Sequence, residues 1–285
     1  MRLWPRWWRW LGFGLGGALV AGAVFAATQR EVSAWTGIAA ISDPATAIAT
    51  AKANGVDRLA VFVNDSSFTA GAWRTYDPAA VVACCAAIRG AGLRASLVSW
   101  MTPRPDWIGQ GARELGELAR AAGVDEIDLD LEEPWTVIRA WSDAHIKQAV
   151  AELFANLRSG FGGKVWVDCI VGADLRALGP AIEASDGVIP QAYRVAANAG
   201  FPDIEARALA KYRPFGKPVA LGVAAYWSSK PFELADPGTV RRALANAAAL
   251  GVRRVRIWRL EFLRPAVGAE FVAFKRGDTE PRAAA

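Results

Sequence analysis

The segment VDEIDLDLEEPW, residues 124–135, carries six carboxyl groups among twelve residues. Its apolar residues alternate with acids, which is the pattern of a β-strand with two different faces. The acids that share one face are Asp128, Asp130 and Glu132. The apolar residues of the opposite face are Ile127, Leu129 and Leu131. Burying such a row of carboxyl groups is costly without cations or shared protons, so the pattern indicates acid–base chemistry rather than core packing.

Glu132 stands last in the row and is the candidate general acid. Repulsion from Asp130 and partial burial favour its protonated form, which a general acid must have near neutral pH. The competing interpretation is a structural acid at the rim of the fold, paired with Arg254 or Arg256. We also expect Arg256 to neutralise Asp128, so that Asp130 and Glu132 can hold opposite protonation states.

The segments that position these acids repeat one pattern of turn, short β-branched run, polar loop and Ala-rich helix. Strands are expected at 34–41, 57–63, 93–100, 125–132, 164–171, 187–193, 218–227 and 253–260. Helices between them include 43–55, 77–92, 108–123, 142–160 and 236–251, several with Asp-Pro or Ser-Asp starts and Gly ends. This alternation predicts an α/β fold, a (β/α)8 TIM barrel over residues 31–275. An open doubly wound sheet is the alternative, but no Gly-rich phosphate loop follows the first strand.

Residues 1–30 precede the predicted barrel and have the pattern of an export signal. A basic, Trp-rich start, MRLWPRWWRW, is followed by the uncharged run LGFGLGGALVAGAVFAA. Cleavage after Ala26 is expected, and retention as an N-terminal membrane anchor is the alternative. Cleavage and retention both predict an exported protein, which is periplasmic, secreted or held at the outer face of the cytoplasmic membrane. Membrane contact is expected only through this segment, and residues 276–285 are predicted to be a disordered tail.

The charge and composition of the sequence limit the classes of partner that it predicts. The net charge is +5, but Arg2, Arg6 and Arg9 lie in the leader, so the remainder is close to neutral and nucleic acid is not a predicted partner. Thirteen Trp residues favour a ligand with flat rings or sugar faces. We expect a monomer.

Metal and cysteine chemistry have little support in the sequence. The single histidine, His145, lies in a polar helical segment and is expected at the surface, so His-rich metal sites are excluded. A Mg²⁺ or Ca²⁺ site made by the carboxyl groups alone stays an alternative, and no cofactor is predicted. Cys84, Cys85 and Cys169 do not form a disulfide framework.

Asp125, Asp128, Asp130 and Glu132 have the spacing DxxDxDxE on the fourth expected strand. This resembles the strand-four signature of family 18 glycoside hydrolases, the chitinase-like enzymes. The resemblance implies that Glu132 is general acid and then base, that Asp130 contacts the substrate's acetamide, and that Asp128 holds Asp130. The sugar's own N-acetyl group then acts as nucleophile. The implied reaction is retaining hydrolysis of β-linked N-acetylhexosamine polymers, such as peptidoglycan or chitin-like chains.

Two other strand ends fit this resemblance. The segment IPQAYR resembles the family's Met-x-Tyr-Asp segment, which implies that Tyr193 binds the acetamide oxygen, with Gln191 on the same face. Trp258 falls where such enzymes keep a Trp beneath the reacting sugar. The sequence departs from the family at Glu126, where Gly is usual, and at Arg194, where an acid often follows the tyrosine. The family's Ser-x-Gly-Gly is also missing from strand three.

Further residues at predicted strand ends are candidates for substrate contact, although packing is the competing interpretation of each aromatic. They are Asn64, Asp65, Trp100, Tyr226 and Trp227. Asp168, within strand five, is a candidate second acid for a mechanism without the acetamide. Two other functions therefore stay open: a muramidase-type or other glycoside hydrolase without substrate assistance, and a non-catalytic barrel that binds cell-wall carbohydrate.

Overall fold

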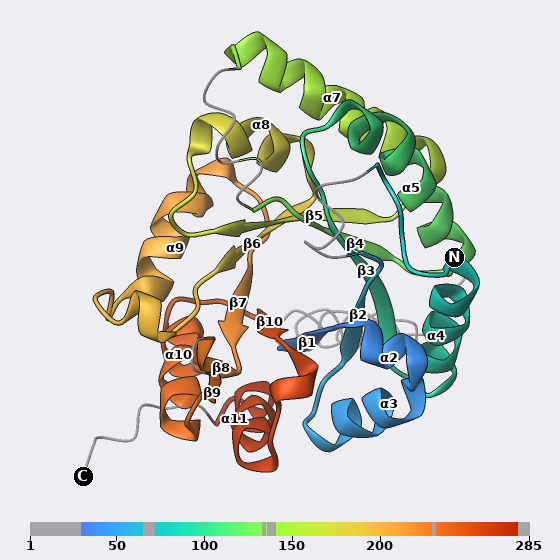
Figure 1. Ribbon diagram of the computed structural model, residues 1–285. Helices are drawn as coiled ribbons and strands as arrows, with labels where there is room; N and C mark the ends of the chain where they lie inside the picture. Colours follow the sequence, from blue (N-terminus) through green and yellow to red (C-terminus); the bar gives the residue numbers. More distant parts are fainter. Residues whose placement is uncertain (1–29, 65–71, 133–134, 136–140, 230–231, 279–285) are drawn as a thin grey trace, which may run out of the picture.

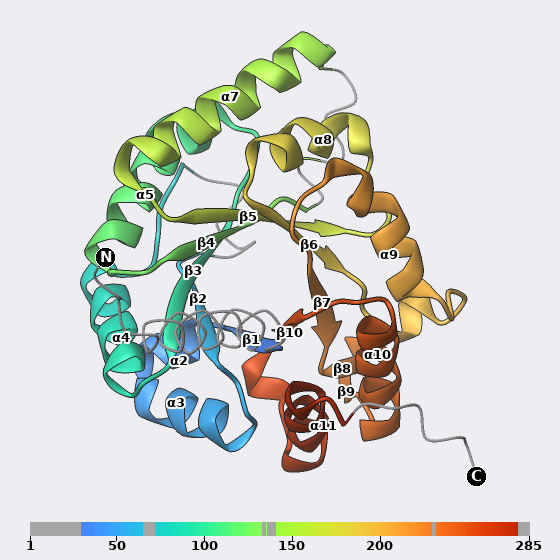
Figure 2. The same cartoon turned by 180° about the vertical axis from the view of Figure 1, so that it is seen from behind.

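Eight parallel strands of the described chain close into a barrel, and helices surround it on the outside (Figures 1 and 2). The computed structural model describes residues 30–64, 72–132, 135, 141–229 and 232–278. The order around the barrel is β1-β10-β7-β6-β5-β4-β3-β2. These strands are β1 (Glu31–Thr36), β2 (Arg58–Phe62), β3 (Arg94–Trp100), β4 (Glu126–Asp130), β5 (Lys164–Ile170), β6 (Gly187–Gln191), β7 (Ala220–Ala224) and β10 (Arg254–Trp258). The predicted (β/α)8 barrel is confirmed.

The helices of the outer layer begin where the sequence places capping residues. The side chains of Asp43, Asp77, Ser142 and Asp236 each accept a hydrogen bond from a backbone N–H in the first turn. The helices are α2 (Ile38–Ser42), α3 (Pro44–Ala53), α4 (Pro78–Gly90), α5 (Ala112–Ala121), α7 (Asp143–Gly160), α8 (Leu175–Ala184), α9 (Ile204–Tyr212), α10 (Pro237–Ala249) and α11 (Pro265–Arg276). Because these caps are local signals, the starts of α3, α4, α7 and α10 agree with the sequence-based prediction.

The predicted first strand, 34–41, is wrong in its bounds. Strand β1 begins at Glu31 and ends at Thr36, and Ile38–Ser42 forms the short helix α2. Glu31 and Ser33 look like loop residues in the sequence because they are polar. Their side chains instead lie among charged groups at the start of the barrel strands, where Ser33 donates a hydrogen bond to Glu31.

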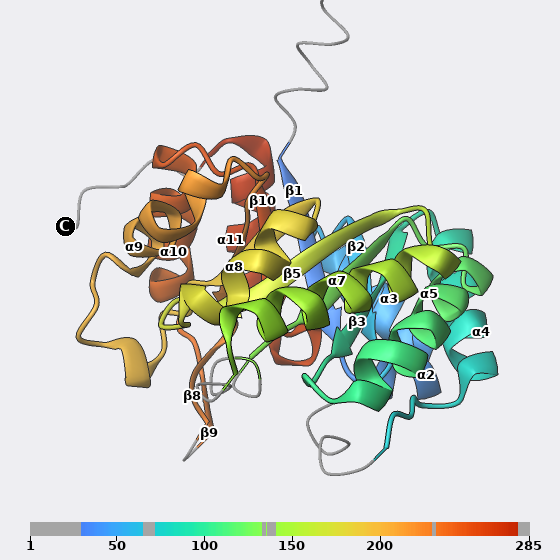
Figure 3. The same cartoon turned by 90° about the horizontal axis from the view of Figure 1, so that it is seen from above.

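The predicted seventh strand, 218–227, is too long. Strand β7 ends at Ala224, and Tyr226 begins a separate antiparallel hairpin of β8 (Tyr226–Ser229) and β9 (Phe232–Leu234). The hairpin projects from one end of the barrel (Figure 3). Tyr226 and Trp227 therefore follow the barrel strand rather than close it.

Two cores lie on the two faces of the barrel wall. As predicted, Ile127, Leu129 and Leu131 are fully buried in the core that faces the helices. The smaller inner core includes Trp35, Phe62, Val98, Trp166, Ile189 and Tyr193. Gly187 is required next to Trp166, because a Cβ atom at this position would lie 2.3 Å from the indole ring. The inner core leaves room for charged side chains along β4 and β10.

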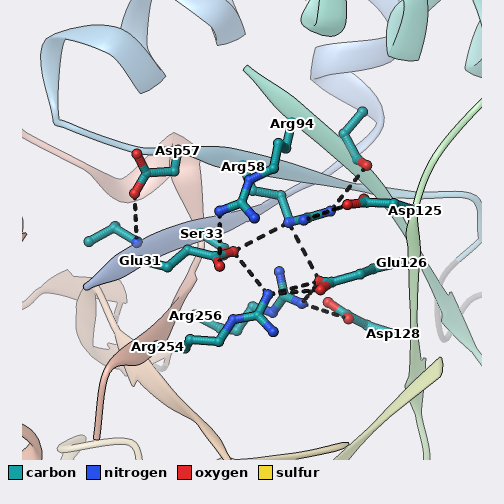
Figure 4. Close-up of polar contacts among 12 residues, drawn as sticks. Glu31, Ser33, Asp57, Arg58, Arg94, Asp125, Glu126, Asp128, Arg254 and Arg256 are labelled. Atoms are coloured by element: carbon teal, nitrogen blue, oxygen red, sulfur yellow. Dashed lines mark hydrogen bonds and ion pairs between the residues drawn. The ribbon is translucent and has the colours of Figure 1, made fainter. Parts of the chain in front are cut away.

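The charged groups at the N-terminal ends of the strands form what we call the basal ion network (Figure 4). Its members are Glu31, Arg58, Arg94, Asp125, Glu126, Asp128, Arg254 and Arg256. Arg254 binds Glu31 and Glu126, with its Nη2 atom 3.0 Å and 2.9 Å from the carboxylate oxygens. Charged groups of both signs thus fill the end of a barrel interior that branched apolar residues usually fill.

Glu31 is expected to make the fold sensitive to acid. Burial favours its neutral form, but Arg254, Arg94 and Arg256 overcome this effect and lower its pKa from 4.5 to about 2. A lowered folded-state pKa contributes stability above the unfolded-state pKa, and the contribution is lost as the pH falls from 4.5 towards 2. Glu31→Gln should therefore lower the free energy of unfolding by ~3 kcal/mol at neutral pH and by little near pH 2.

Urea denaturation at the two pH values measures this difference. The control is Glu183→Gln, the same exchange at an exposed position of α8, which should change stability at neither pH. An equal loss from Glu31→Gln at both pH values would show that the carboxylate's charge is not the cause.

The predicted leader and tail fall largely outside the described residues. Residues 1–29 and 279–285 are not described, and Arg276 of the predicted tail is the last residue of α11. Within the ranges that the structure does describe, every helix is too short or too polar to cross a bilayer.

Candidate active site

Three acids and one amide meet at the C-terminal ends of β4, β5 and β6. Asp130, the last residue of β4, is the Cα partner of Asp168 on β5. Glu132 follows β4 by two residues. The Nε2 atom of Gln191, the last residue of β6, donates hydrogen bonds to Glu132 Oε1 at 2.6 Å and to Asp168 Oδ2 at 3.0 Å. We call Asp130, Glu132, Asp168 and Gln191 the acid cluster.

Asp128 belongs to the basal ion network and not to the acid cluster. Its Oδ1 atom accepts a hydrogen bond from Arg256 Nη2 at 3.0 Å, and its Oδ2 atom accepts one from Trp35 Nε1 at 3.0 Å. The predicted pairing of Arg256 with Asp128 is confirmed. Arg254 and Arg256 also bind Glu126 at the start of β4, so they neutralise acids at the opposite end of the strand from Glu132.

The acid cluster favours protonated carboxyl groups. Burial, followed by the charge of Glu132, raises the pKa of Asp130 and of Asp168 well above its ordinary value. Gln191 and the backbone N–H of Cys169 oppose this rise at Asp168, whereas Asp168 itself adds to it at Asp130. Because like charges repel, ionisation of one carboxyl group in the cluster disfavours ionisation of its neighbours.

Two tyrosines border the acids as neutral hydrogen-bond donors. Burial raises the pKa of Tyr193 well above its ordinary value, and the nearby Asp168 and Glu132 raise it further. Burial and Glu132 also raise the pKa of Tyr226. Gly222 on β7 permits the approach of Tyr193, because a Cβ atom there would lie 3.2 Å from the tyrosine Cε1. Both hydroxyl groups therefore keep their protons across the neutral range.

Two tryptophans end strands at the same side of the barrel. Trp258, the last residue of β10, packs edge-on against Trp35 and Phe62, with ring centroids 5.6 Å and 5.5 Å apart. Trp100, the last residue of β3, is the Cα partner of Asp130, and its indole N–H has no hydrogen-bond partner among the described residues. The predicted position of Trp258 beneath a reacting sugar stays a prediction.

The remaining candidates are more scattered. Asn64 is fully buried, and its Oδ1 atom accepts a hydrogen bond from Ser99 Oγ at 3.2 Å. Arg194, which stands where the family often has an acid, binds the buried Glu205 through its Nε and Nη2 atoms. Asp65 lies outside the described residues. The Nδ2 atom of Asn64 is buried and has no hydrogen-bond partner among the described residues, so substrate contact by Asn64 stays a prediction. Arg194 has a structural partner.

Metal ligation has no evident site in the part of the chain that the structure describes. There, His, Cys, Asp and Glu side chains do not form a group of three suited to a metal ion. His145 lies at the surface, as predicted, and stacks on Trp141 with ring centroids 4.0 Å apart.

No protein-family model matches the sequence, and no curated protein matches it significantly. Solved structures do match. A chitinase from Rhizomucor miehei has a TM-score of 0.62 and 13% sequence identity, covering 86% of this chain and 100% of that one. The fold is that of the chitinase barrel. This confirms the family 18 resemblance at the level of the fold.

Other proteins share this barrel. The spore cortex-lytic enzyme of Bacillus cereus has a TM-score of 0.58 and 11% identity, over 86% of this chain and 75% of that one. A xylanase and α-amylase inhibitor protein from Scadoxus multiflorus has a TM-score of 0.60 and 14% identity, over 87% and 98%. Because enzymes and an inhibitor share the fold, the side chains of the site must decide the function.

Proposed function

We propose that this protein is a glycoside hydrolase that cleaves β-linked N-acetylhexosamine polymers, with Glu132 as general acid and base. The observation that carries the proposal is the position of Glu132. It lies just beyond the C-terminal end of β4, beside buried Asp130 and hydrogen-bonded by Gln191. Active sites of TIM barrels lie at this end of the strands.

The proposed reaction begins with proton transfer from Glu132 to the glycosidic oxygen. The carbonyl oxygen of the substrate's acetamide attacks the anomeric carbon as the bond to the leaving sugar breaks. Asp130 accepts a hydrogen bond from the acetamide N–H, and the neutral hydroxyl of Tyr193 donates one to its oxygen. Glu132 then takes a proton from water, which opens the cyclic intermediate and restores the enzyme. Two displacements at one carbon give net retention of configuration.

The substrate class follows from the proposed mechanism and from the predicted leader. A participating acetamide requires an N-acetylhexosamine at the reacting position. Export through residues 1–30 would bring the protein to the cell envelope, which makes peptidoglycan the leading substrate and a chitin-like chain the second. We expect the protein to act as a monomer outside the cytoplasm.

Incubation of the purified protein with chitooligosaccharides and with purified peptidoglycan tests the proposal, with products identified by mass. New reducing ends are expected, and a GlcNAc end supports the assigned activity. A MurNAc end would indicate a muramidase. Binding without any new reducing end would instead support a carbohydrate-binding barrel. The absence of both binding and cleavage would contradict the hydrolase assignment and the carbohydrate-binding assignment alike.

A second function, glycoside hydrolysis without help from the acetamide, is favoured by one observation. Asp168 is a buried acid that shares the Nε2 atom of Gln191 with Glu132, so two enzyme carboxyl groups lie close together. Oligomers of glucosamine, which lack the N-acetyl group, separate the two mechanisms. If the acetamide is the nucleophile, their hydrolysis should be slower by about 10²-fold or more than that of the acetylated oligomers. Equal rates would favour a carboxylate of the enzyme.

A further inference from the structure

Asp130 and Asp168 form a buried pair of carboxyl groups. Their strands β4 and β5 are adjacent and parallel, the two residues are direct Cα partners, and each is 2% exposed. Their side chains lie within hydrogen-bonding reach of each other. The pair is therefore closed off from water and must satisfy its polar atoms internally.

One oxygen atom of each carboxyl group in this pair lacks a donor. Asp130 Oδ1 and Asp168 Oδ1 are buried and have no hydrogen-bond partner within the described ranges. Two ionised carboxylates in this position would repel each other and leave both oxygens unsatisfied. One proton between the two groups removes both costs, because a protonated carboxyl group donates to its neighbour.

Asp128 is the partner that the family resemblance implies for Asp130, but both of its carboxylate oxygens accept hydrogen bonds from other residues. One of its oxygens accepts a hydrogen bond from Arg256 and the other from Trp35. Its nearest counter-charge is thus a cation of the basal ion network. Asp168 is the acid that lies directly opposite Asp130 on the neighbouring strand, within hydrogen-bonding reach of it.

We propose that Asp168 is a positioning residue that shares one proton with Asp130 and accepts this proton when Asp130 turns to the substrate's acetamide. The inference rests on the proposed function, because it gives Asp130 the role of acetamide acceptor. In the step, the O–H bond on Asp130 breaks and an O–H bond on Asp168 forms, so no proton enters or leaves the site. Asp130 becomes the anion that an N–H donor requires.

Gln191 sets the direction of this exchange. Its Nε2 atom donates to Asp168 Oδ2 at 3.0 Å, which stabilises Asp168 as the anion before substrate binds. The same nitrogen donates to Glu132 Oε1 at 2.6 Å. The resting proton therefore lies on Asp130, and Gln191 holds Asp168 and Glu132 at a fixed separation.

Carboxyl titration by ¹³C NMR, with aspartate labelled at the side-chain carbon, tests the shared proton in the full protein without substrate. In the wild type, Asp130 and Asp168 should respond to the same two steps, because strongly interacting acids titrate as a pair. In Asp168→Asn, the upper step that Asp130 shares with Asp168 should be absent, and the apparent midpoint of Asp130 should move by about 1 pH unit or more, while its interaction with Glu132 remains.

Asp43→Asn is the matched control, because asparagine also caps a helix and Asp43 caps the exposed start of α3. It should leave the Asp130 titration unchanged. An unchanged Asp130 titration in Asp168→Asn would overturn the inference, as would loss of the upper step in Asp128→Asn alone.

Hydrolysis of chitotetraose adds the functional readout. Asp168→Asn should lower kcat by about 10- to 100-fold with little change in KM, because Asp130 is misplaced only in the reacting complex. An undiminished kcat would show that Asp168 does not position Asp130 for the reaction. If the wild type cleaves nothing but its two acids titrate as a pair, the proposed function fails while the shared proton stands.

Discussion

Glu132→Gln is expected to reduce hydrolysis of chitotetraose by about 10²- to 10⁴-fold, the usual contribution of a positioned general acid. Glutamine has the same size but does not release a proton to the glycosidic oxygen. Its side-chain oxygen can still accept the hydrogen bond that Gln191 donates to Glu132 in the wild type, so the local geometry should persist. Initial rates from reducing-end assays give the fold-change.

The loss of hydrolysis identifies Glu132 as the general acid only if the variant remains folded and still binds chitotetraose. Calorimetric titration with chitotetraose should give a dissociation constant close to that of the wild type under conditions where the wild type does not turn over. Glu183→Gln on the exposed surface of α8 is the control exchange and should keep full activity. Undiminished turnover by Glu132→Gln would show that Glu132 is not the general acid.

Arg256→Met should destabilise the fold by roughly 3–5 kcal/mol, the typical effect of removing one partner from a buried ion pair. Arg256 is fully buried, and its Nη2 atom lies 2.9 Å from Glu126 Oε2 and 3.0 Å from Asp128 Oδ1. Methionine fills much of the same volume but leaves Asp128 without its cation. Chemical denaturation at neutral pH measures the loss.

A double variant identifies the cause of this loss. Asp128→Asn combined with Arg256→Met removes the uncompensated carboxylate, so it should be more stable than Arg256→Met alone. Arg207→Met is the control, because Arg207 and Asp203 form an exposed pair whose removal should cost no more than about 1 kcal/mol. If the double variant lost as much stability as the two single variants together, the charge of Asp128 would not be the reason.

The acids of β4 divide into two groups along the strand. Glu126 and Asp128, at its start and middle, are neutralised by Arg254 and Arg256. Asp130 lies at its end, where burial and the charge of Glu132 raise its pKa well above the ordinary value. A strand can carry this row of acids because one half is paired with arginine, and burial with nearby negative charge favours the neutral form of Asp130 in the other half.

Local patterns predicted much of this arrangement. Alternation along a strand has a period of two, so the separation of Asp128 and Asp130 from Leu129 could be read directly. Helix caps such as Asp43 and Asp236 are equally local. These features depend on neighbours within a few residues, and they agree with the structure.

Features that depend on distant partners were not predictable in the same way. The start of β1 was missed because Glu31 is stabilised by Arg94 and Arg254, far away in the sequence. Asp168 was recognised only as a second acid, because its contact with Asp130 depends on the register between β4 and β5. Asn64, predicted to bind substrate, accepts a hydrogen bond from Ser99, and its contact with substrate stays a prediction.

Proton NMR of chitotetraose during hydrolysis by the wild-type protein tests the central claim most directly, because it reports cleavage and stereochemistry in one experiment. Protonation by Glu132 with attack by the acetamide predicts that the first new reducing ends are β-anomers, with α-anomers appearing later through mutarotation. Initial formation of the α-anomer, or the absence of new reducing ends from both chitotetraose and peptidoglycan, would contradict the account.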